Sequence, residues 1–266
     1  MQKWDVHSDF HTHTTYSHGT GSVEDNVIAA RRAGLRCVAI TDHAVRHPLV
    51  GVRPSRIPAM RADVDAVQKK YPDIRVLLGM EANLIGMQGE IDLRPQDIRQ
   101  LDIVLAGYHL SAVPKRVSDI FRIQAGGVFK HVFRTNTKAQ RERNTEMFMR
   151  AVQRNPIDIL THPGFRLDVD YERIGQACAE YGTYIEISSR HRVPDAEALQ
   201  ALAACGAQFV INSDAHKPTN IAHWDWALQQ AEAAGIGPDR IVNIGNRNIV
   251  WRSRRELIID GSSEGV

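Results

Sequence analysis

Short apolar runs alternate along the chain with longer segments whose apolar residues recur every three to four positions. Seven runs have the length and β-branched content of strands, and they span residues 4–10, 36–41, 74–80, 102–108, 157–161, 183–188 and 208–213. Amphipathic segments typical of helices span residues 22–34, 138–154, 171–182, 195–206 and 220–235. Strands that alternate with helices predict parallel strands joined by crossover helices. We therefore expect an α/β fold built on a parallel sheet.

Two segments depart from this alternation. Residues 44–57 contain several Pro and Gly and predict a long loop, whereas residues 110–137 form an insertion that is longer than most connections. Between Lys115 and Arg143, eight Lys or Arg residues accompany only two acidic ones. This charge is equally typical of a solvated face and of a basic lid over an anionic substrate.

The composition is that of a globular protein, with 43% apolar and 24% charged residues among 266. We predict one domain over residues 1–266, with a frayed tail from about residue 260. A net charge of +2 is too small to attract nucleic acid or membranes by bulk charge. Three well-separated cysteines and the lack of an apolar leader or membrane-spanning run favour reduced thiols in a cytoplasmic protein.

Histidines and acidic residues follow almost every predicted strand. Those at strand ends are His11, His13, His43, Glu81, His109, His162, Asp214 and His216, and His18 lies in the loop after the first strand. A parallel β/α barrel brings all its strand carboxyl ends to one face, so these side chains should converge there. So many titratable groups in one cleft require cations. Imidazole and carboxylate ligands suit Zn, Mn or Fe, and nine of them exceed the needs of one ion, so we expect two or three.

Six motifs carry a resemblance to a known family. The segments "DFHTHT", "ITDH", "GMEAN", "AGYH", "THPG" and "SDAH" occur in this order over roughly residues 5–250. Together they resemble the PHP (polymerase and histidinol phosphatase) family of metal-dependent phosphoesterases, and most closely its stand-alone bacterial phosphatases. The resemblance implies a distorted seven-stranded (β/α)7 barrel with a trinuclear metal centre at the carboxyl ends of its strands.

The resemblance also implies how the ligands are shared. His11, His13, Glu81 and Asp214 would hold one metal ion. Glu81 would bridge to a second ion, which His109 and His162 would also hold. The third ion would be held by His18, His43 and His216, and many relatives carry aspartate at the position of His18.

Other residues are candidates for supporting roles. Asp9 and Asp42 adjoin predicted ligands, and each could accept a ring N–H and thereby orient an imidazole; ordinary turn or cap roles are the alternative. Glu186, inside "YIEIS", is either a buried structural residue or directed at the metals. Four more histidines are predicted not to be ligands: His7, His47, His131 and His223. Of these, His47 and His131 lie in loops that could reach the mouth of the site.

Phosphate binding needs a basic group beside the metals. Arg166 follows "HPG", Arg190 follows the sixth predicted strand, and Lys217 follows the last ligand. Arginine suits bidentate phosphate recognition, although each of these cations could also be a solvated surface residue. His191 could add a hydrogen bond or protonate the leaving group.

These residues together predict a phosphoesterase in which a metal-activated hydroxide attacks phosphorus, with no separate protein nucleophile. Patterns for a serine or cysteine nucleophile and for a phosphate-binding P-loop are missing from the sequence. The expected substrate is a small phosphomonoester, such as histidinol phosphate, or a nucleotide-type phosphate. Three alternatives remain at this stage: an amidohydrolase, a 3′–5′ exonuclease that tracks a nucleic-acid strand with the basic insertion, and a non-catalytic metal-stabilised module. The oligomeric state stays open.

Overall fold

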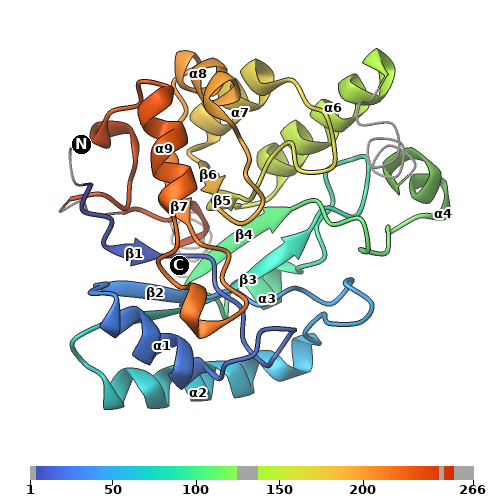
Figure 1. The fold of residues 1–266 in the computed structure, drawn as a ribbon. Helices are drawn as coiled ribbons and strands as arrows, with labels where there is room; N and C mark the ends of the chain where they lie inside the picture. Colours follow the sequence, from blue (N-terminus) through green and yellow to red (C-terminus); the bar gives the residue numbers. More distant parts are fainter. Residues whose placement is uncertain (1–3, 125–136, 246–248, 255–266) are drawn as a thin grey trace, which may run out of the picture.

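Seven strands lie side by side in the order in which they occur in the chain, and all neighbours are parallel. In the computed structural model, which describes residues 4–124, 137–245 and 249–254, they curve into a nearly closed barrel (Figure 1). The strands are β1 Ser8–Asp9, β2 Cys37–Ile40, β3 Arg75–Asn83, β4 Ile103–Gly107, β5 Ile159–Leu160, β6 Tyr184–Ser188 and β7 Phe209–Asn212. The predicted seven-stranded β/α barrel is confirmed.

The first and last strands meet just beyond their carboxyl ends. Thr12 and Ala215 form a parallel bridge, in which the Ala215 N–H donates to the His11 carbonyl and the His13 N–H donates to the Ala215 carbonyl. The side chain of Asn212 adds a third link, because its Oδ1 accepts from the Phe10 N–H at 3.0 Å. These bonds close the barrel at the end where the predicted ligands lie.

Helices cover the outside of the barrel (Figure 1). They are α1 Val23–Arg32, α2 Ile57–Lys70, α3 Pro95–Ile98, α4 Val117–Asp119, α6 Lys138–Arg154, α7 Tyr171–Tyr181, α8 Ala196–Ala204 and α9 Asp225–Ala233. Short turns of helix complete the outer layer: η1 Pro54–Arg56, η2 Ile120–Gln124, η3 Pro218–Asn220 and η4 Pro238–Arg240. Ser22 caps α1 as predicted, and Gly182 ends α7 in the left-handed conformation.

Helix α2 was not predicted from the sequence, in which no helix was expected between the loop 44–57 and the third strand. This helix begins at Ile57 and buries Ile57, Met60, Val64 and Val67 against the barrel, a three-to-four spacing typical of an amphipathic helix. The helix predicted over 220–235 is shorter than expected, because a 3₁₀ turn occupies 218–220 and α9 begins only at Asp225.

Two apolar clusters separate the inside of the barrel from its outside. Ile185 and Ile187 of β6 pack outward against the helices. The inner cluster contains Phe10, Ala39, Leu77, Ile103, Leu105, Ile159, Val210, Val242 and Trp251. Because side chains alternate along a strand, residues two and four positions beyond this inner layer also point inward, towards the carboxyl end of the barrel. Leu77, Gly79 and Glu81 show this progression from apolar to charged.

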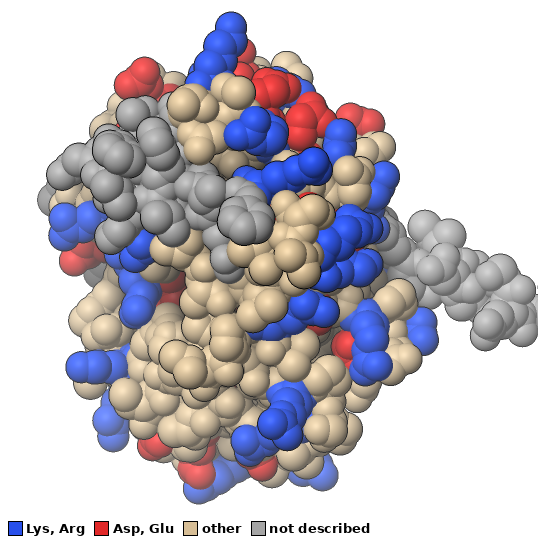
Figure 2. Space-filling view, turned by 90° about the vertical axis from the view of Figure 1, so that its right-hand side faces the viewer, with Lys and Arg blue, Asp and Glu red and all other residues tan. Residues whose placement is uncertain are grey.

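Basic residues in the described part of the insertion pair with carboxylates. Arg116 lies 2.8 Å from Glu90 and 3.7 Å from Asp119, and Lys115 lies 3.9 Å from Glu90. Lys and Arg side chains are spread over the face that carries α4 (Figure 2). Residues 125–136 of the insertion and the tail predicted from about residue 260 lie outside the described residues.

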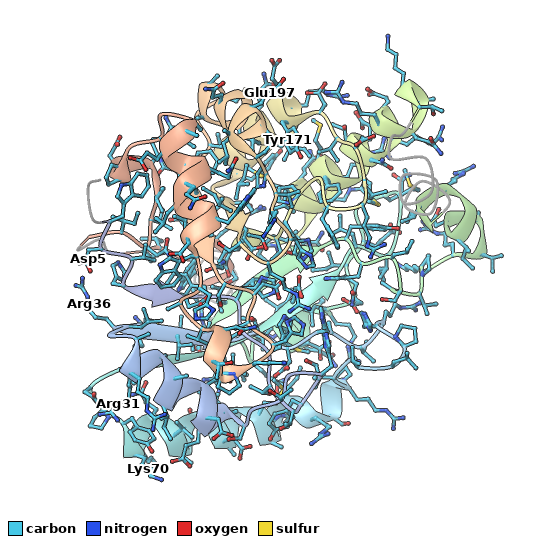
Figure 3. The ribbon with its side chains drawn as sticks, in the orientation of Figure 1. Asp5, Arg31, Arg36, Lys70, Tyr171 and Glu197 are labelled. Atoms are coloured by element: carbon cyan, nitrogen blue, oxygen red, sulfur yellow. The ribbon has the colours of Figure 1, made fainter. Side chains whose placement is uncertain are left out.

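Charged pairs on the outer surface lie away from the barrel axis (Figure 3). Arg36 binds Asp5 at 3.0 Å, and Arg31 binds Asp73 at 2.9 Å. Exposed pairs of this kind contribute about 0–1 kcal/mol each. Within the described residues, no helix combines the length and apolar character needed to cross a membrane.

Candidate metal centre at the carboxyl end of the barrel

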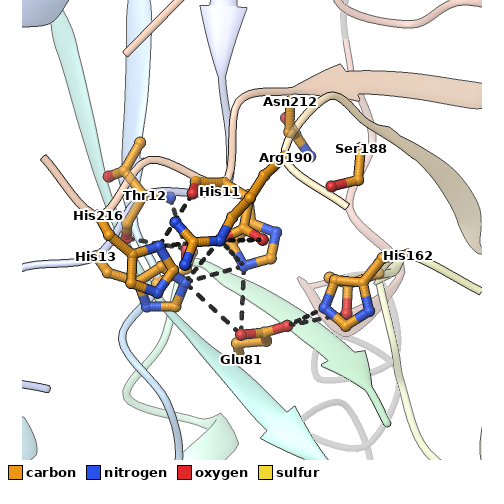
Figure 4. A network of polar contacts seen from close by, with 12 residues as sticks. His11, Thr12, His13, Glu81, His162, Ser188, Arg190, Asn212 and His216 are labelled. Carbon is orange, nitrogen blue, oxygen red and sulfur yellow. Dashed lines mark hydrogen bonds and ion pairs between the residues drawn. The ribbon is translucent and has the colours of Figure 1, made fainter. Parts of the chain in front are cut away.

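Glu81 faces histidines on two sides, and dashed lines join its oxygens to their rings (Figure 4). Its side chain is buried at the end of β3, and its two oxygens face different groups. Oε2 lies 3.3 Å from His11 Nε2 and 2.9 Å from His43 Nδ1. Oε1 lies 3.2 Å from His109 Nε2 and 3.0 Å from His162 Nε2. One carboxylate thus links imidazoles from β1, β2, β4 and β5.

Asp214 forms a second point of convergence just after β7. Its Oδ1 lies 3.4 Å from His13 Nε2 and 3.3 Å from His216 Nδ1. Its Oδ2 lies 3.0 Å from His191 Nε2 and 3.8 Å from Arg190 Nε. The carboxylates of Glu81 and Asp214 together contact ring nitrogens around the whole mouth of the barrel.

Local backbone geometry aims two of these residues. His162 and Asp214 adopt φ values of 32° and 53°, which non-glycine residues rarely take. Gly107, at the end of β4, has no side chain and therefore leaves room for the side chains of Thr161 and His162. A methyl group at this position would clash with the Thr161 hydroxyl and come within 3.0 Å of His162 Cε1. Strained backbone that the surrounding fold holds in place is common at functional sites.

The crowding of charge shifts the ionisation of these groups strongly. Burial opposes the charge on His11, but the nearby carboxylates of Glu186, Glu81 and Asp214 raise its pKa well above the usual value. Burial also opposes the charges on Glu81 and Asp214, yet the surrounding histidines hold both pKa values well below the usual range. For His43 and His216 burial dominates, and it lowers their pKa values to about 3 and about 4.

The arrangement suits divalent cations. Four groups of donor atoms lie close enough to share an ion: His13 with His43 and His216, His11 with His13 and Asp214, His43 with Glu81 and His109, and His162 with His191 and Asp214. Among the described residues, Glu81 Oε2 and Asp214 Oδ1 are buried without a hydrogen-bond donor. Buried carboxylate oxygens beside imidazole nitrogens are the donor set that Zn, Mn or Fe would satisfy.

All nine predicted ligands lie at this end of the barrel, but their grouping differs in detail from the expected one. His18 joins none of the four groups, although its ring centroid lies 4.2 Å from that of His216 and 4.9 Å from that of His43. His191, predicted as a substrate contact, joins a group with His162 and Asp214. The ligand assignments themselves remain predictions.

A cavity of about 130 Å³ opens above the centre and is lined by titratable groups from six segments of the chain. Arg190 and His191 line it, as does His47, which was predicted not to be a ligand but to lie in a loop that could reach the mouth. The ring of His47 lies 5.0 Å from that of His43, and its Nε2 lies 2.6 Å from Ser111 Oγ. Its position four residues after His43, in the same loop, is what brings it to the mouth of the cavity.

Arg166 and Lys217 do not line this cavity. The guanidinium of Arg166 lies 5.2 Å from the ring of Phe165, which in turn lies 3.9 Å from the ring of His191. Lys217 is exposed at the start of η3. Of the three predicted phosphate-binding cations, the structure therefore brings only Arg190 to the mouth of the cavity.

Asp9 and Asp42, expected either to orient a ring or to serve turn or cap roles, bind loop groups in this structure. Asp9 accepts backbone N–H groups of His11, Ser213 and Ala222. Asp42 accepts from the backbone and hydroxyl groups of Thr14 and Ser17. Both carboxylates therefore shape the loops that carry the ligands and do not contact an imidazole.

Different residues hold the rings. His11 Nδ1 lies 2.7 Å from Glu186 Oε1, and His109 Nδ1 lies 2.9 Å from Asn83 Oδ1. The orientation of the Asn83 amide is fixed by Asp92, whose Oδ2 accepts its Nδ2–H at 2.7 Å. Strand alternation was the available signal, because Glu186 and Asn83 each fall on the inward-facing set of their strands.

The PHP domain family model matches residues 9–190, which is more than half of the chain. The chain belongs to the PHP domain family. A relative from Shewanella sp. (strain MR-4), named a probable phosphatase, is 30% identical over 245 residues, covering 88% of this chain and 86% of the relative. A probable phosphatase from Syntrophotalea carbinolica is 30% identical over 246 residues, covering 88% and 90%. The predicted family and enzyme class, a PHP-type phosphatase, are confirmed.

Solved structures show the same PHP fold. Histidinol phosphate phosphatase from Lactococcus lactis, in complex with zinc, L-histidinol and phosphate, matches with a TM-score of 0.60. It is 16% identical, and the match covers 86% of this chain and 93% of that one. At this identity the likeness establishes the barrel architecture alone.

Proposed function

We propose that this protein is a metal-dependent phosphatase that hydrolyses a small phosphomonoester or a nucleotide-type phosphate. The observation that carries the proposal is the pair of buried carboxylates, Glu81 and Asp214, surrounded by ring nitrogens at the carboxyl end of a PHP barrel. The naming of its relatives as probable phosphatases supports the same reaction class.

The proposed ligands of two or three divalent ions are His11, His13, His18, His43, Glu81, His109, His162, Asp214 and His216. Zn, Mn and Fe all suit this mixture of imidazole and carboxylate. When bound, such ions lower the pKa of water towards neutrality and neutralise charge on a phosphoryl group. Glu81 is suited to bridge two ions, because each of its oxygens faces its own set of histidines.

The chain's own residues would bind and orient the phosphate. Arg190 reaches over the cavity with its Nε 3.8 Å from Asp214 Oδ2, and its guanidinium fork matches two phosphate oxygens. His191 lies beside it, with Nε2 3.0 Å from Asp214 Oδ2, in a position to donate a hydrogen bond to the phosphate or the leaving oxygen. We assign these two residues to substrate binding and retain neither Arg166 nor Lys217.

The size of the cavity favours a substrate that inserts only its phosphate. The cavity measures only about 130 Å³ and is lined by titratable groups. A phosphoryl group bound among these groups would leave the rest of the substrate outside the ring of histidines. Histidinol phosphate belongs in the first test, because the Lactococcus lactis structure contains L-histidinol and phosphate.

Phosphate release from a panel of phosphomonoesters, nucleotides and short oligonucleotides tests the proposal. Metal-stripped protein is refilled separately with Zn, Mn or Fe, and a variant with both His11→Ala and His13→Ala is the control. We expect metal-dependent turnover of at least one monoester and none in the control. Bound metal without turnover of any substrate would contradict the proposal, and turnover of oligonucleotides alone would favour the exonuclease.

A further inference from the structure

Strand β6 supplies none of the predicted metal ligands, yet it directs a carboxylate beneath the centre. Glu186 is the middle residue of Tyr184–Ser188, and its side chain is buried inside the barrel. Its neighbours Ile185 and Ile187 point to the opposite side, into the outer core. A charged residue in the interior of a buried strand is costly unless hydrogen bonds compensate it.

Glu186 makes three such bonds, and two of them hold predicted ligands. Oε1 lies 2.7 Å from the ring Nδ1 of His11 and accepts from Asn212 Nδ2 at 3.0 Å. Oε2 accepts the backbone N–H of His162 at 3.0 Å. Asn212 is itself fixed, since its Oδ1 accepts from the Phe10 N–H. The carboxylate is thereby tied to β1, β5 and β7 at once.

The bond to His11 determines which ring nitrogen is available to a metal. A carboxylate only accepts hydrogen bonds, so Nδ1 of His11 carries a proton that it donates to Glu186, and Nε2 is the ring nitrogen left to bind a metal. Nε2 faces Glu81 Oε2 at 3.3 Å and Asp214 Oδ1 at 3.8 Å. A cation, either the Nε2 proton or a metal ion that replaces it, would satisfy both carboxylate oxygens.

The bond to His162 acts on the backbone instead of the ring. His162 has a φ of 32°, a conformation that costs energy in a residue other than glycine. The hydrogen bond from its N–H to Glu186 helps to maintain this conformation. In it, His162 Nε2 lies 3.0 Å from Glu81 Oε1.

We propose that Glu186 is a positioning residue that sets the metal affinity of the centre by fixing the tautomer of His11 and the backbone of His162. This inference rests on the metal centre of the proposed function. It concerns a residue outside the predicted ligand set and outside the substrate contacts. Partners of this kind behind metal-binding histidines typically change metal affinity by about 10- to 100-fold when they are replaced.

The substitution Glu186→Gln tests the proposal with little change in volume. An amide offers one acceptor oxygen and one NH₂ donor, so it can accept from the His11 Nδ1–H or from the His162 N–H but not from both, and its NH₂ would favour the other His11 tautomer. We expect the dissociation constant for zinc, measured by competition with a chromogenic chelator, to rise about 10- to 100-fold. We also expect the ¹⁵N spectrum of the zinc-loaded native protein to show His11 protonated at Nδ1.

Asp158 provides a matched control. It is another buried carboxylate, next to β5, and it accepts from the Val104 N–H, the Ser253 N–H and the Ser253 hydroxyl, none of which is a predicted ligand. Asp158→Asn should lower thermal stability while leaving the zinc dissociation constant within about twofold of the native value. Glu186→Asp, which retains a carboxylate, should bind zinc more tightly than Glu186→Gln.

The outcomes separate the two proposals. Unchanged zinc affinity in Glu186→Gln, or a His11 protonated at Nε2 in the native protein, would overturn the role of Glu186 and leave the phosphatase proposal standing. If the native protein binds zinc tightly but has no phosphatase activity, and Glu186→Gln binds zinc more weakly, the result would support the role of Glu186 and contradict the proposed reaction. If Glu186→Gln does not fold, Glu186→Asp is compared with the native protein: its shorter side chain should weaken zinc binding, and an unchanged dissociation constant would overturn the role of Glu186.

Discussion

The two ends of the barrel carry cavities of different size, and the smaller cavity is the one lined by chemical groups. At the amino ends of β1, β2 and β3 lies a cavity of about 470 Å³, bordered by Phe10, Leu77 and Trp251 together with Arg36 and Arg75. At the carboxyl end lies one of about 130 Å³, lined by histidines, carboxylates and Arg190. The larger cavity lies beneath the inner core, whereas the smaller one is lined by possible metal-binding atoms that follow most of the strands. Convergence of ligand atoms, more than volume, identifies the chemical site.

The largest effect should come from removing the shared carboxylate at the carboxyl end. Glu81→Gln keeps the shape of the side chain but removes the charge that faces four imidazoles. We expect kcat/KM for the best phosphomonoester to fall by about 10³-fold or more, equivalent to about 4 kcal/mol of transition-state stabilisation. Steady-state kinetics with saturating metal provide the measurement. A loss below tenfold would show that the donor atoms around Glu81 are not the chemical site.

The amino end should respond in the opposite way. Trp251 packs edge-to-face on Phe10 with ring centroids 5.0 Å apart, so Trp251→Ala should cost about 3 kcal/mol of unfolding free energy. Because this contact lies beneath the inner core, kcat per folded molecule should stay within about twofold. Urea denaturation and kinetics on the same preparation give both quantities. A large fall in kcat would contradict the view that the amino end contributes to stability and not to catalysis.

Gly107→Ala should affect stability and activity together. The added methyl group would press on Thr161 and His162 in the tightest part of the carboxyl end. Overpacking of this kind costs about 1–3 kcal/mol, and the displaced imidazole should also lower kcat. Ala106→Gly, at the neighbouring position on the outer face of β4, is a useful control. It should lower stability but leave kcat near the native value.

Acid should destabilise the metal-free protein through the carboxyl end. Burial lowers the pKa of His43 to about 3 in the fold, whereas histidine in an unfolded chain titrates near 6.5. Below about pH 6.5 the unfolded state therefore binds more protons, and the stability falls as the pH is lowered. From pH 7 to pH 5 this residue should account for about 2 kcal/mol. His43→Gln should show a correspondingly smaller decline in denaturation experiments, and an equal decline would contradict the assignment.

The smallest effect concerns the rim of the same cavity. Arg190 is partly exposed, and its guanidinium approaches Asp214 from above the centre. Arg190→Ala should raise KM by about tenfold, or about 1.4 kcal/mol, with a lesser change in kcat. Arg190→Lys should recover only part of the loss, because an ammonium lacks the bidentate fork. An unchanged KM in both variants would show that Arg190 does not bind the substrate.

Much of this organisation could be predicted from the order of residues. Seven apolar runs predicted the strands. Because parallel strands end on the same side, the polar residues that follow them predicted that His11, Glu81 and Asp214 lie on one face. The six motifs then indicated the family that the comparisons confirm.

The supporting residues were harder to predict, for physical reasons. Asp9 and Asp42 adjoin ligands in sequence, but backbone N–H groups of neighbouring loops reach their oxygens first. Glu186 is 175 residues away from the imidazole that it orients. Such a pairing depends on the tilt and closure of the barrel, which a strand pattern does not specify. The same holds for the choice between Arg166, Arg190 and Lys217, which depends on the path of each loop.

The junction between the first and last strands has a consequence for how the protein is made. The Thr12–Ala215 bridge joins segments about two hundred residues apart, and the backbone bonds around it place His11 and His13 beside Asp214. Closing so long a loop has an entropic cost, and during synthesis the second partner emerges long after the first. A nascent chain that ends before β7 therefore has neither a closed barrel nor the Asp214 half of the centre. The capacity to bind metal is completed only when the last strand is added.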